Sequence, residues 1–104
     1  MKLISSIVVA TTLAFGIQAH ADDAGKALAQ KSGCLACHSV DTKVVGPAFK
    51  DVSAKYKGNG AEAKLVDKVK KGGSGVWGPI PMPANSPQVK DDDIKTIVSW
   101  VLTL

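Results

Sequence analysis

Arginine is absent from this sequence, whose 13 basic residues are all lysines set against 9 acidic residues. Arginine is the side chain best suited to bidentate recognition of phosphates and base edges. The lysines are spread along the chain instead of forming a block, which is typical of charges that keep a surface solvated. Nucleic-acid binding is therefore not expected.

The sequence also lacks an uninterrupted apolar run long enough to span a bilayer, which needs about 20 residues. Its one long apolar segment, residues 3–17, is broken by Ser, Thr and Gly. Lys2 precedes this segment and the small residues Ala19 and Ala21 follow it, in the three-part order of a secretory signal. We predict a signal peptide over residues 1–21, cleavage after Ala21, a periplasmic location and no stable membrane insertion afterwards. A retained membrane anchor is the alternative.

Cysteine is scarce, and two residues of this type exclude a disulfide framework. Cleavage after Ala21 leaves 83 residues (104 − 21), which form one domain over residues 22–104. A chain of this size buries too little apolar surface to be robust unaided, and small domains usually add disulfides, a metal or a cofactor. A large apolar cofactor is therefore expected on size alone.

Strand-like alternation of apolar and polar residues is missing as well, and the periodicity is helical. Helices are predicted over residues 24–32, 49–57 and 61–71, and from Asp91 onward. In the last of these, apolar residues recur at the spacing of a buried helix face: Ile94, Ile97, Val98 and Val101. The irregular stretches 39–48 and 72–90 need something to pack on. The sequence predicts an all-α fold of about four helices, with long loops wrapped around a central object.

The segment Cys34-Leu35-Ala36-Cys37-His38 contains the residues with the clearest chemistry. Two thiols three residues apart suit addition to the two vinyl groups of one haem, and His38 is then placed to ligate the iron. A thioredoxin-like pair requires a βαβ pattern, a structural zinc site requires four ligands, and a plain disulfide gives His38 no role. In an exported chain, the motif favours one covalently bound haem c.

Four motifs occur in a fixed order: Cys34-Leu35-Ala36-Cys37-His38, Val45-Gly46-Pro47-Ala48, the segment from Gly75 to Pro83, and Trp100-Val101-Leu102. Together they resemble the small bacterial class I cytochromes c of the cytochrome c-551 type. The resemblance covers essentially all of residues 22–104. It implies the class I cytochrome c fold around one haem.

Met82 is the one methionine of residues 22–104. A lone methionine is often a flexible filler of the core, but Pro81 and Pro83 fix the backbone around this one. The resemblance assigns Met82 to the sixth coordination position, opposite His38. A His/Met pair of axial ligands raises the reduction potential of the iron.

The resemblance also implies residues that support the two ligands. The carbonyl of Pro47 would accept a hydrogen bond from the far nitrogen of His38, which orients the ring. Trp77 would donate its indole N–H to a haem propionate, the alternative being an ordinary core aromatic. Asn85 would donate to the sulfur of Met82, the alternative being a simple turn residue.

Three further positions compare with the family less directly. Lys68 matches a basic residue near a propionate, but lysine lacks the planar fork of arginine. Residues 85–89 form a stretch a residue or two longer than in relatives. Ala29 stands where relatives have an aromatic residue, so lighter packing of the first helix on the last is expected.

The resemblance implies a carrier of single electrons and not an enzyme, because two filled axial positions leave no site for a substrate on the iron. The implied partners are larger redox proteins of the cell envelope: a quinol-oxidising complex as donor, and an oxidase or nitrite reductase as acceptor. A monomer is expected. A peroxidase-like enzyme, which needs an open sixth position, and a gas or redox sensor, which usually has an output domain, are the alternatives.

Overall fold

The computed structural model describes residues 21–104, so the predicted signal peptide, apart from Ala21, lies outside the described residues. This part of the chain forms four α-helices and one short 3-10 helix: α1 (Ala21–Lys31), η1 (Cys34–Ala36), α2 (Phe49–Tyr56), α3 (Glu62–Lys71) and α4 (Asp91–Val101). No strand occurs over residues 21–104, where two isolated β-bridges are found. The all-α prediction is confirmed, and the sequence did not predict η1.

Local chemistry accounts for where the helices end. Gly33, after α1, has φ of 80°, and Gly72, after α3, has φ of 73°, a left-handed region that glycine enters without strain. The N-terminus of α4 carries three acidic residues in its first turn, where the helix dipole favours negative charge. α1 begins three residues earlier than predicted, at Ala21.

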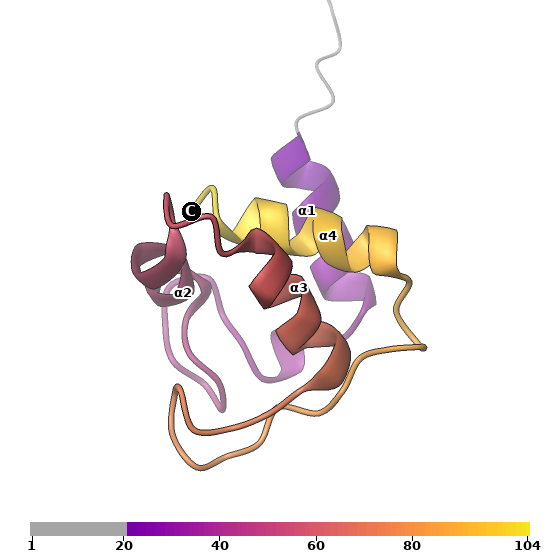
Figure 1. Cartoon of the computed structure of the whole chain (residues 1–104). Helices are drawn as coiled ribbons and strands as arrows, with labels where there is room; N and C mark the ends of the chain where they lie inside the picture. The colour runs from indigo at the N-terminus through magenta and orange to yellow at the C-terminus, as the bar shows by residue number, and fades with distance from the viewer. Residues whose placement is uncertain (1–20) are drawn as a thin grey trace, which may run out of the picture.

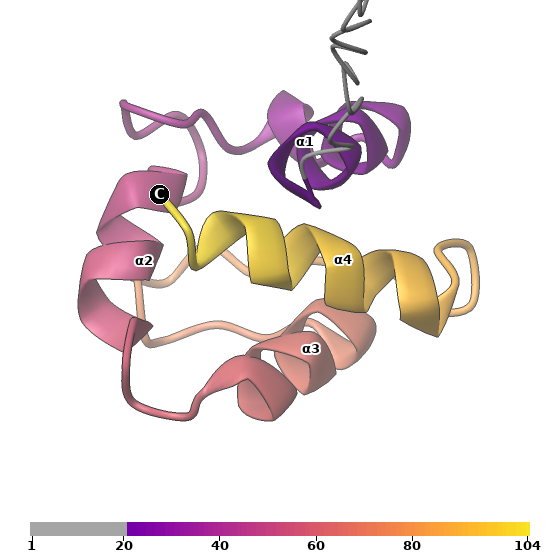
Figure 2. The ribbon, with the colours of Figure 1, turned by 90° about the horizontal axis from the view of Figure 1, so that it is seen from above.

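Figure 2 shows α4 lying between α1 and α3, with α2 beside the C-terminal end of α4. Loops 39–48 and 72–90 both extend into the lower part of the molecule in Figure 1, away from the N-terminal end of α1. α1 and α4 approach closely at Gly25, where an added Cβ atom would lie 2.1 Å from the Cβ atom of Trp100. The bare backbone of Gly25 is therefore what permits this helix crossing.

Two apolar clusters form the core, and α4 contributes to both. The larger cluster joins α1, α2 and α4 through Ala29, Phe49, Ile97, Trp100 and Val101. The smaller one joins α3 and α4 through Val66, Ile94 and Val98. The predicted buried face of α4 is thus confirmed, as is the core position of Trp100.

Ala29 is completely buried and has the smallest side chain of the larger cluster. The side chains of Phe49 and Trp100 belong to the same cluster and meet edge to face, with ring centroids 5.4 Å apart. α1 therefore contributes a small side chain to the cluster at this position, and lighter packing on α4 than in relatives stays a prediction. Within residues 21–104, no helix has the length and apolar character needed to cross a membrane.

Candidate functional site

The motif of two cysteines and a histidine forms a tight turn directly after α1. The left-handed Gly33 starts η1, and the amides of Cys37 and His38 both donate to the carbonyl of Cys34, at 3.3 and 3.0 Å. The carbonyl of Cys37 in turn accepts the amide of Gly46 at 2.8 Å. The backbone of the motif is therefore held by its own turn and by loop 39–48.

Cys34 and Cys37 are free thiols, each half-buried. Burial raises the pKa of the Cys34 thiol, whose side chain packs against the larger apolar cluster. Over residues 21–104, no group of three or more His, Cys, Asp or Glu side chains is arranged to hold a metal ion.

His38 is oriented by contacts on two sides. Its Nδ1 atom lies 2.8 Å from the carbonyl oxygen of Pro47, and its ring stacks on Phe49 with centroids 4.9 Å apart. A carbonyl only accepts hydrogen bonds, so Nδ1 is the protonated nitrogen and Nε2 keeps its lone pair for another partner. A Cβ atom at Gly46 would lie 2.5 Å from Cε1 of His38, so glycine is needed to make room for the ring.

Met82 is half-buried and pairs with Gly73, two residues after the C-terminal end of α3. Its amide donates to the carbonyl of Gly73 at 2.8 Å, and its own carbonyl accepts the amide of Gly73 at 3.0 Å. Gly72 packs so closely that a Cβ atom there would lie 2.4 Å from the carbonyl oxygen of Met82. These contacts fix the backbone of Met82 relative to α3.

Asn85, three residues after Met82, also forms hydrogen bonds that fix the segment containing the methionine. Its backbone amide and its side-chain Nδ2 atom both donate to the carbonyl of Val69, at 3.1 and 3.3 Å. Nδ2 also donates to the carbonyl of Pro83 at 3.2 Å. An amide NH₂ group has two hydrogens, and both are directed here to carbonyl oxygens. In this structure, Asn85 therefore connects the methionine segment to α3.

Trp77 lies at the surface, 41% exposed, and is not a core aromatic. The ammonium of Lys55 lies 5.0 Å from the centroid of its indole ring and 5.6 Å from that of the Tyr56 ring. Cations at these distances from an aromatic face are attracted to it. Lys55 thus links loop 72–90 to α2, a contact that the sequence did not predict.

Lys68, on α3, extends over the start of loop 72–90. A Cβ atom built on Gly73 would lie 2.7 Å from its Nζ atom. The ion pairs of residues 21–104 involve other lysines, so the ammonium of Lys68 is left without a carboxylate. Its positive charge therefore lies close to the Gly73–Met82 bridge.

Large apolar side chains are exposed on the two irregular loops and not on the helices. They are Val44, Val45, Val76, Trp77 and Ile80, between 41% and 61% exposed. The same loops contain Pro47 and Met82. The cysteine-histidine motif directly precedes the first loop and carries two free thiols and the unused Nε2 atom of His38. This donor set, surrounded by uncovered apolar surface, fits a large apolar cofactor with a metal at its centre.

Of the predicted residues, His38 and Pro47 are in direct contact, and Lys68 and Asn85 lie beside the methionine segment at the end of α3. Trp77 instead contacts Lys55 of α2. Phe49 and Lys55 contact site residues but were missed, because their partners are brought to them only by the tertiary fold. The close approach of Gly46 to the imidazole of His38 was not predicted either. The only sequence evidence for it was that Gly46 belongs to the Val45-Gly46-Pro47-Ala48 motif.

The family model described as "Cytochrome c" matches residues 23–104. Cytochrome c-551 of Pseudomonas aeruginosa is 51% identical over 102 residues, covering 97% of this chain and 93% of the relative. Cytochrome c-552 of Nitrosomonas europaea is 55% identical over 78 residues, covering 74% of this chain and 75% of the relative.

The fold is also similar to solved structures. The crystal structure of wild-type Nitrosomonas europaea cytochrome c552 superimposes with a TM-score of 0.71 at 54% identity. The match covers 76% of this chain and 98% of that one. It therefore includes nearly the whole of the solved domain.

Proposed function

The chain belongs to the cytochrome c family, as a class I member of the c-551 type, and from this we propose that it is a periplasmic electron carrier whose haem iron is ligated by His38 and Met82. Its fold is the class I all-α cytochrome c fold. It is a monohaem electron carrier with one covalently bound haem c, which the pair Cys34 and Cys37 fits. When bound, the haem supplies one-electron transfer at its iron.

The observation that carries the proposed ligation is the hydrogen bond between His38 and Pro47. Nδ1 donates its proton to the carbonyl at 2.8 Å, which leaves Nε2 as the free ligand nitrogen and raises its basicity. Phe49 supports one face of the ring, and Gly46 leaves space beside it. The chain therefore presents His38 in one tautomer and one orientation.

Met82 is proposed as the second axial ligand. Its backbone is fixed by Gly73 and by the amide of Asn85, so the thioether is offered from a segment that is bound to α3. We assign Trp77 and Lys68 to the propionates, since one offers an indole N–H and the other an unpaired ammonium. A fixed protein frame reduces the rearrangement that accompanies gain or loss of an electron.

Residues 1–21 are proposed to be a signal peptide that directs export to the periplasm. The mature monomer is proposed to exchange electrons with a quinol-oxidising complex as donor and with an oxidase or nitrite reductase as acceptor. An enzymatic role is not proposed, because Met82 would occupy the position that a peroxidase leaves open. A sensor that releases its methionine readily is the second alternative.

An absorption spectrum of the reduced protein, recorded with and without carbon monoxide, distinguishes these functions. A carrier with both axial positions filled gives the same spectrum in both conditions. A peroxidase-like site binds the gas at once, and a sensor binds it with displacement of Met82. Rapid spectral change on adding carbon monoxide would contradict the proposal.

A further inference from the structure

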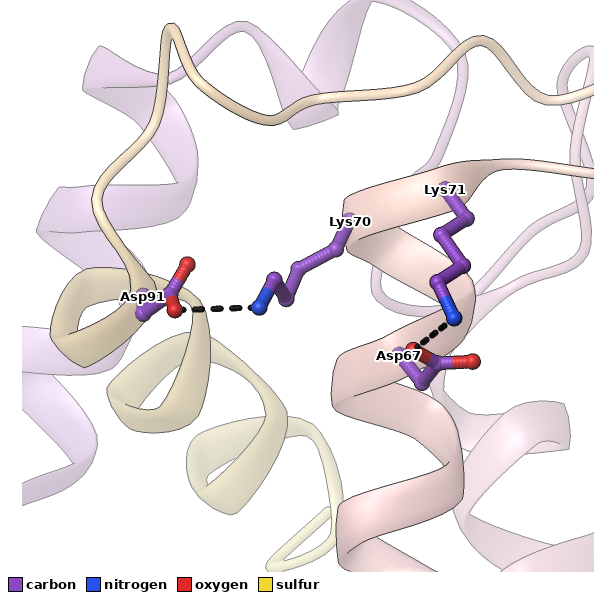
Figure 3. A network of polar contacts seen from close by, with 4 residues as sticks. All are labelled: Asp67, Lys70, Lys71 and Asp91. Atoms are coloured by element: carbon purple, nitrogen blue, oxygen red, sulfur yellow. Dashed lines mark hydrogen bonds and ion pairs between the residues drawn. The ribbon is translucent and has the colours of Figure 1, made fainter.

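An ion pair joins the two ends of the loop that contains Met82. The Nζ atom of Lys70, in the last turn of α3, lies 3.0 Å from Oδ2 of Asp91, the first residue of α4 (Figure 3). Loop 72–90 leaves α3 directly after this turn and returns to α4 directly before Asp91. The pair therefore bridges the loop at its base.

The backbone of the same helical turn binds the returning part of the loop. The carbonyl of Lys70 accepts the amide of Ser86 at 3.3 Å, and the carbonyl of Val69 accepts both donors of Asn85. Lys70 is thus connected to α4 through its side chain and to the loop through its main chain. Separating Lys70 from Asp91 would loosen α4 and the returning part of the loop from this turn.

A second lysine–aspartate ion pair lies nearby, but it connects two residues of the same helix. The Nζ atom of Lys71 lies 3.0 Å from Oδ1 of Asp67, one turn earlier on α3 (Figure 3). Both residues belong to one helix, so this pair does not cross the loop. The side chain of Lys70 is also less exposed than that of Lys71, 32% against 74%, so solvent screens its pair less.

We propose that Lys70 and Asp91 are positioning residues for Met82: their ion pair holds the base of loop 72–90 closed and limits how readily the methionine leaves the iron. This inference rests on the proposed function, in which Met82 is the sixth ligand. Pairs of exposed side chains change an equilibrium by about 1.5- to 5-fold, and the partial burial of Lys70 places this pair in the upper part of that range.

The test uses the oxidised, haem-loaded protein and free imidazole as a competing ligand, with loss of the sulfur-to-iron absorption band as the signal. We expect Lys70→Met and Asp91→Asn each to raise the apparent affinity for imidazole by about two- to five-fold at low salt. The double variant should resemble either single variant, because each removes the same interaction. The increase should shrink in concentrated salt, and Lys70→Arg should restore the original affinity.

Lys71→Met and Asp67→Asn are the matched controls. Lys71→Met removes a lysine from the same helical turn, and so the same interaction with the helix dipole, without opening the loop. These variants should leave the imidazole affinity within about 1.5-fold of the original protein, the lower limit for a pair of this kind. Equal effects of Lys70→Met and Lys71→Met would overturn the inference, while the assignment of Met82 would stand.

Two further measurements separate positioning from general stability. Amide hydrogen exchange at Asn85 and Ser86 should be faster in Lys70→Met than in Lys71→Met, because these amides donate to the last turn of α3. A Lys70→Met variant that unfolds more easily in denaturant yet binds imidazole as before would show a purely structural role and overturn the inference. A sulfur-to-iron band that is missing in the original protein, or that persists in Met82→Ala, would instead contradict the proposed function.

Discussion

The Nδ1 atom of His38 lies 2.8 Å from the carbonyl oxygen of Pro47, nine residues later in the chain. Proline has no amide hydrogen, so this residue acts only as an acceptor and can bind only a protonated ring nitrogen. The contact therefore fixes which nitrogen of His38 carries the proton. It also connects the cysteine-histidine motif to loop 39–48 through a side chain, in addition to the backbone bonds made by Cys37.

Replacing Gly46 with alanine should disturb this arrangement. The new Cβ atom would lie 2.5 Å from Cε1 and 2.9 Å from Nδ1 of His38, so the ring or the loop must shift, which disturbs the hydrogen bond to Pro47. We expect a loss of about 1–3 kcal/mol in the free energy of unfolding, as for other overpacked sites, and a changed reduction potential. Denaturant titration and potentiometry measure the two effects.

Gly58→Ala is the control for this substitution. Gly58 has φ of 79° and no neighbour within 4 Å of an added Cβ atom, so alanine there introduces backbone strain without a steric contact. Its stability should fall while the reduction potential stays the same. A potential that changes equally in both variants would show that the contact with His38 has no special effect.

Covalent attachment should depend on both cysteines of the motif. The haem stain should stay with the protein on a denaturing gel, and Cys37→Ala should fail to mature normally. Without its cofactor the chain should be largely unfolded, because the loops that carry the five exposed apolar side chains lose the surface that covers them. Circular dichroism and haem staining test this, and haem that extracts completely into acidified acetone would contradict covalent attachment.

Met82→Ala should abolish the sulfur-to-iron band of the oxidised protein, since Met82 is the one thioether of residues 22–104. Met82→His should lower the reduction potential, because a nitrogen donor favours ferrous iron less than a soft thioether does. Potentiometry and absorption spectroscopy are the measurements. An unchanged band and potential in Met82→Ala would mean that another group holds the sixth position.

The helices and the buried face of α4 were predictable because they depend on local periodicity, and Ile94, Ile97, Val98 and Val101 lie where the pattern places them. The cysteine-histidine motif was equally readable, since its chemistry is contained in five consecutive residues. The stacking of Phe49 on His38 was not predictable, because it depends on how α2 packs after the chain folds. The direction of a side chain within an irregular loop is likewise set by tertiary contacts.

Asn85 illustrates that last difference. The family resemblance predicts a hydrogen bond to the sulfur of Met82, whereas both hydrogens of its amide group are directed to the carbonyls of Val69 and Pro83. Asn85→Ala should therefore cost about 1 kcal/mol in the free energy of unfolding and raise the affinity for imidazole, with little change in potential. A large change in potential with unchanged stability would instead favour donation to the sulfur.

Partner recognition should have a weak electrostatic component located near the cysteine-histidine motif. The formal net charge of +4 would fall to +3 if Lys2 is removed with the proposed signal peptide, and such a charge is too small to steer a partner over long distances. Lys31, Lys43 and Lys50 are exposed near the motif, and Lys50 is paired with Asp41. Charges act over about 8 Å at physiological salt, so these local residues decide the effect.

Removing a positive charge and removing a negative charge near the motif should change the electron-transfer rate in opposite directions. Lys43→Gln should slow the second-order electron-transfer rate with an acidic partner several-fold and flatten its salt dependence, because a positive charge is lost. Asp41→Asn should accelerate the same reaction, because it removes the negative charge beside Lys50. Stopped-flow rates across a range of ionic strengths measure both. The alternative is recognition by a mainly apolar haem edge alone, and rates that are indifferent to salt and to both substitutions would support it.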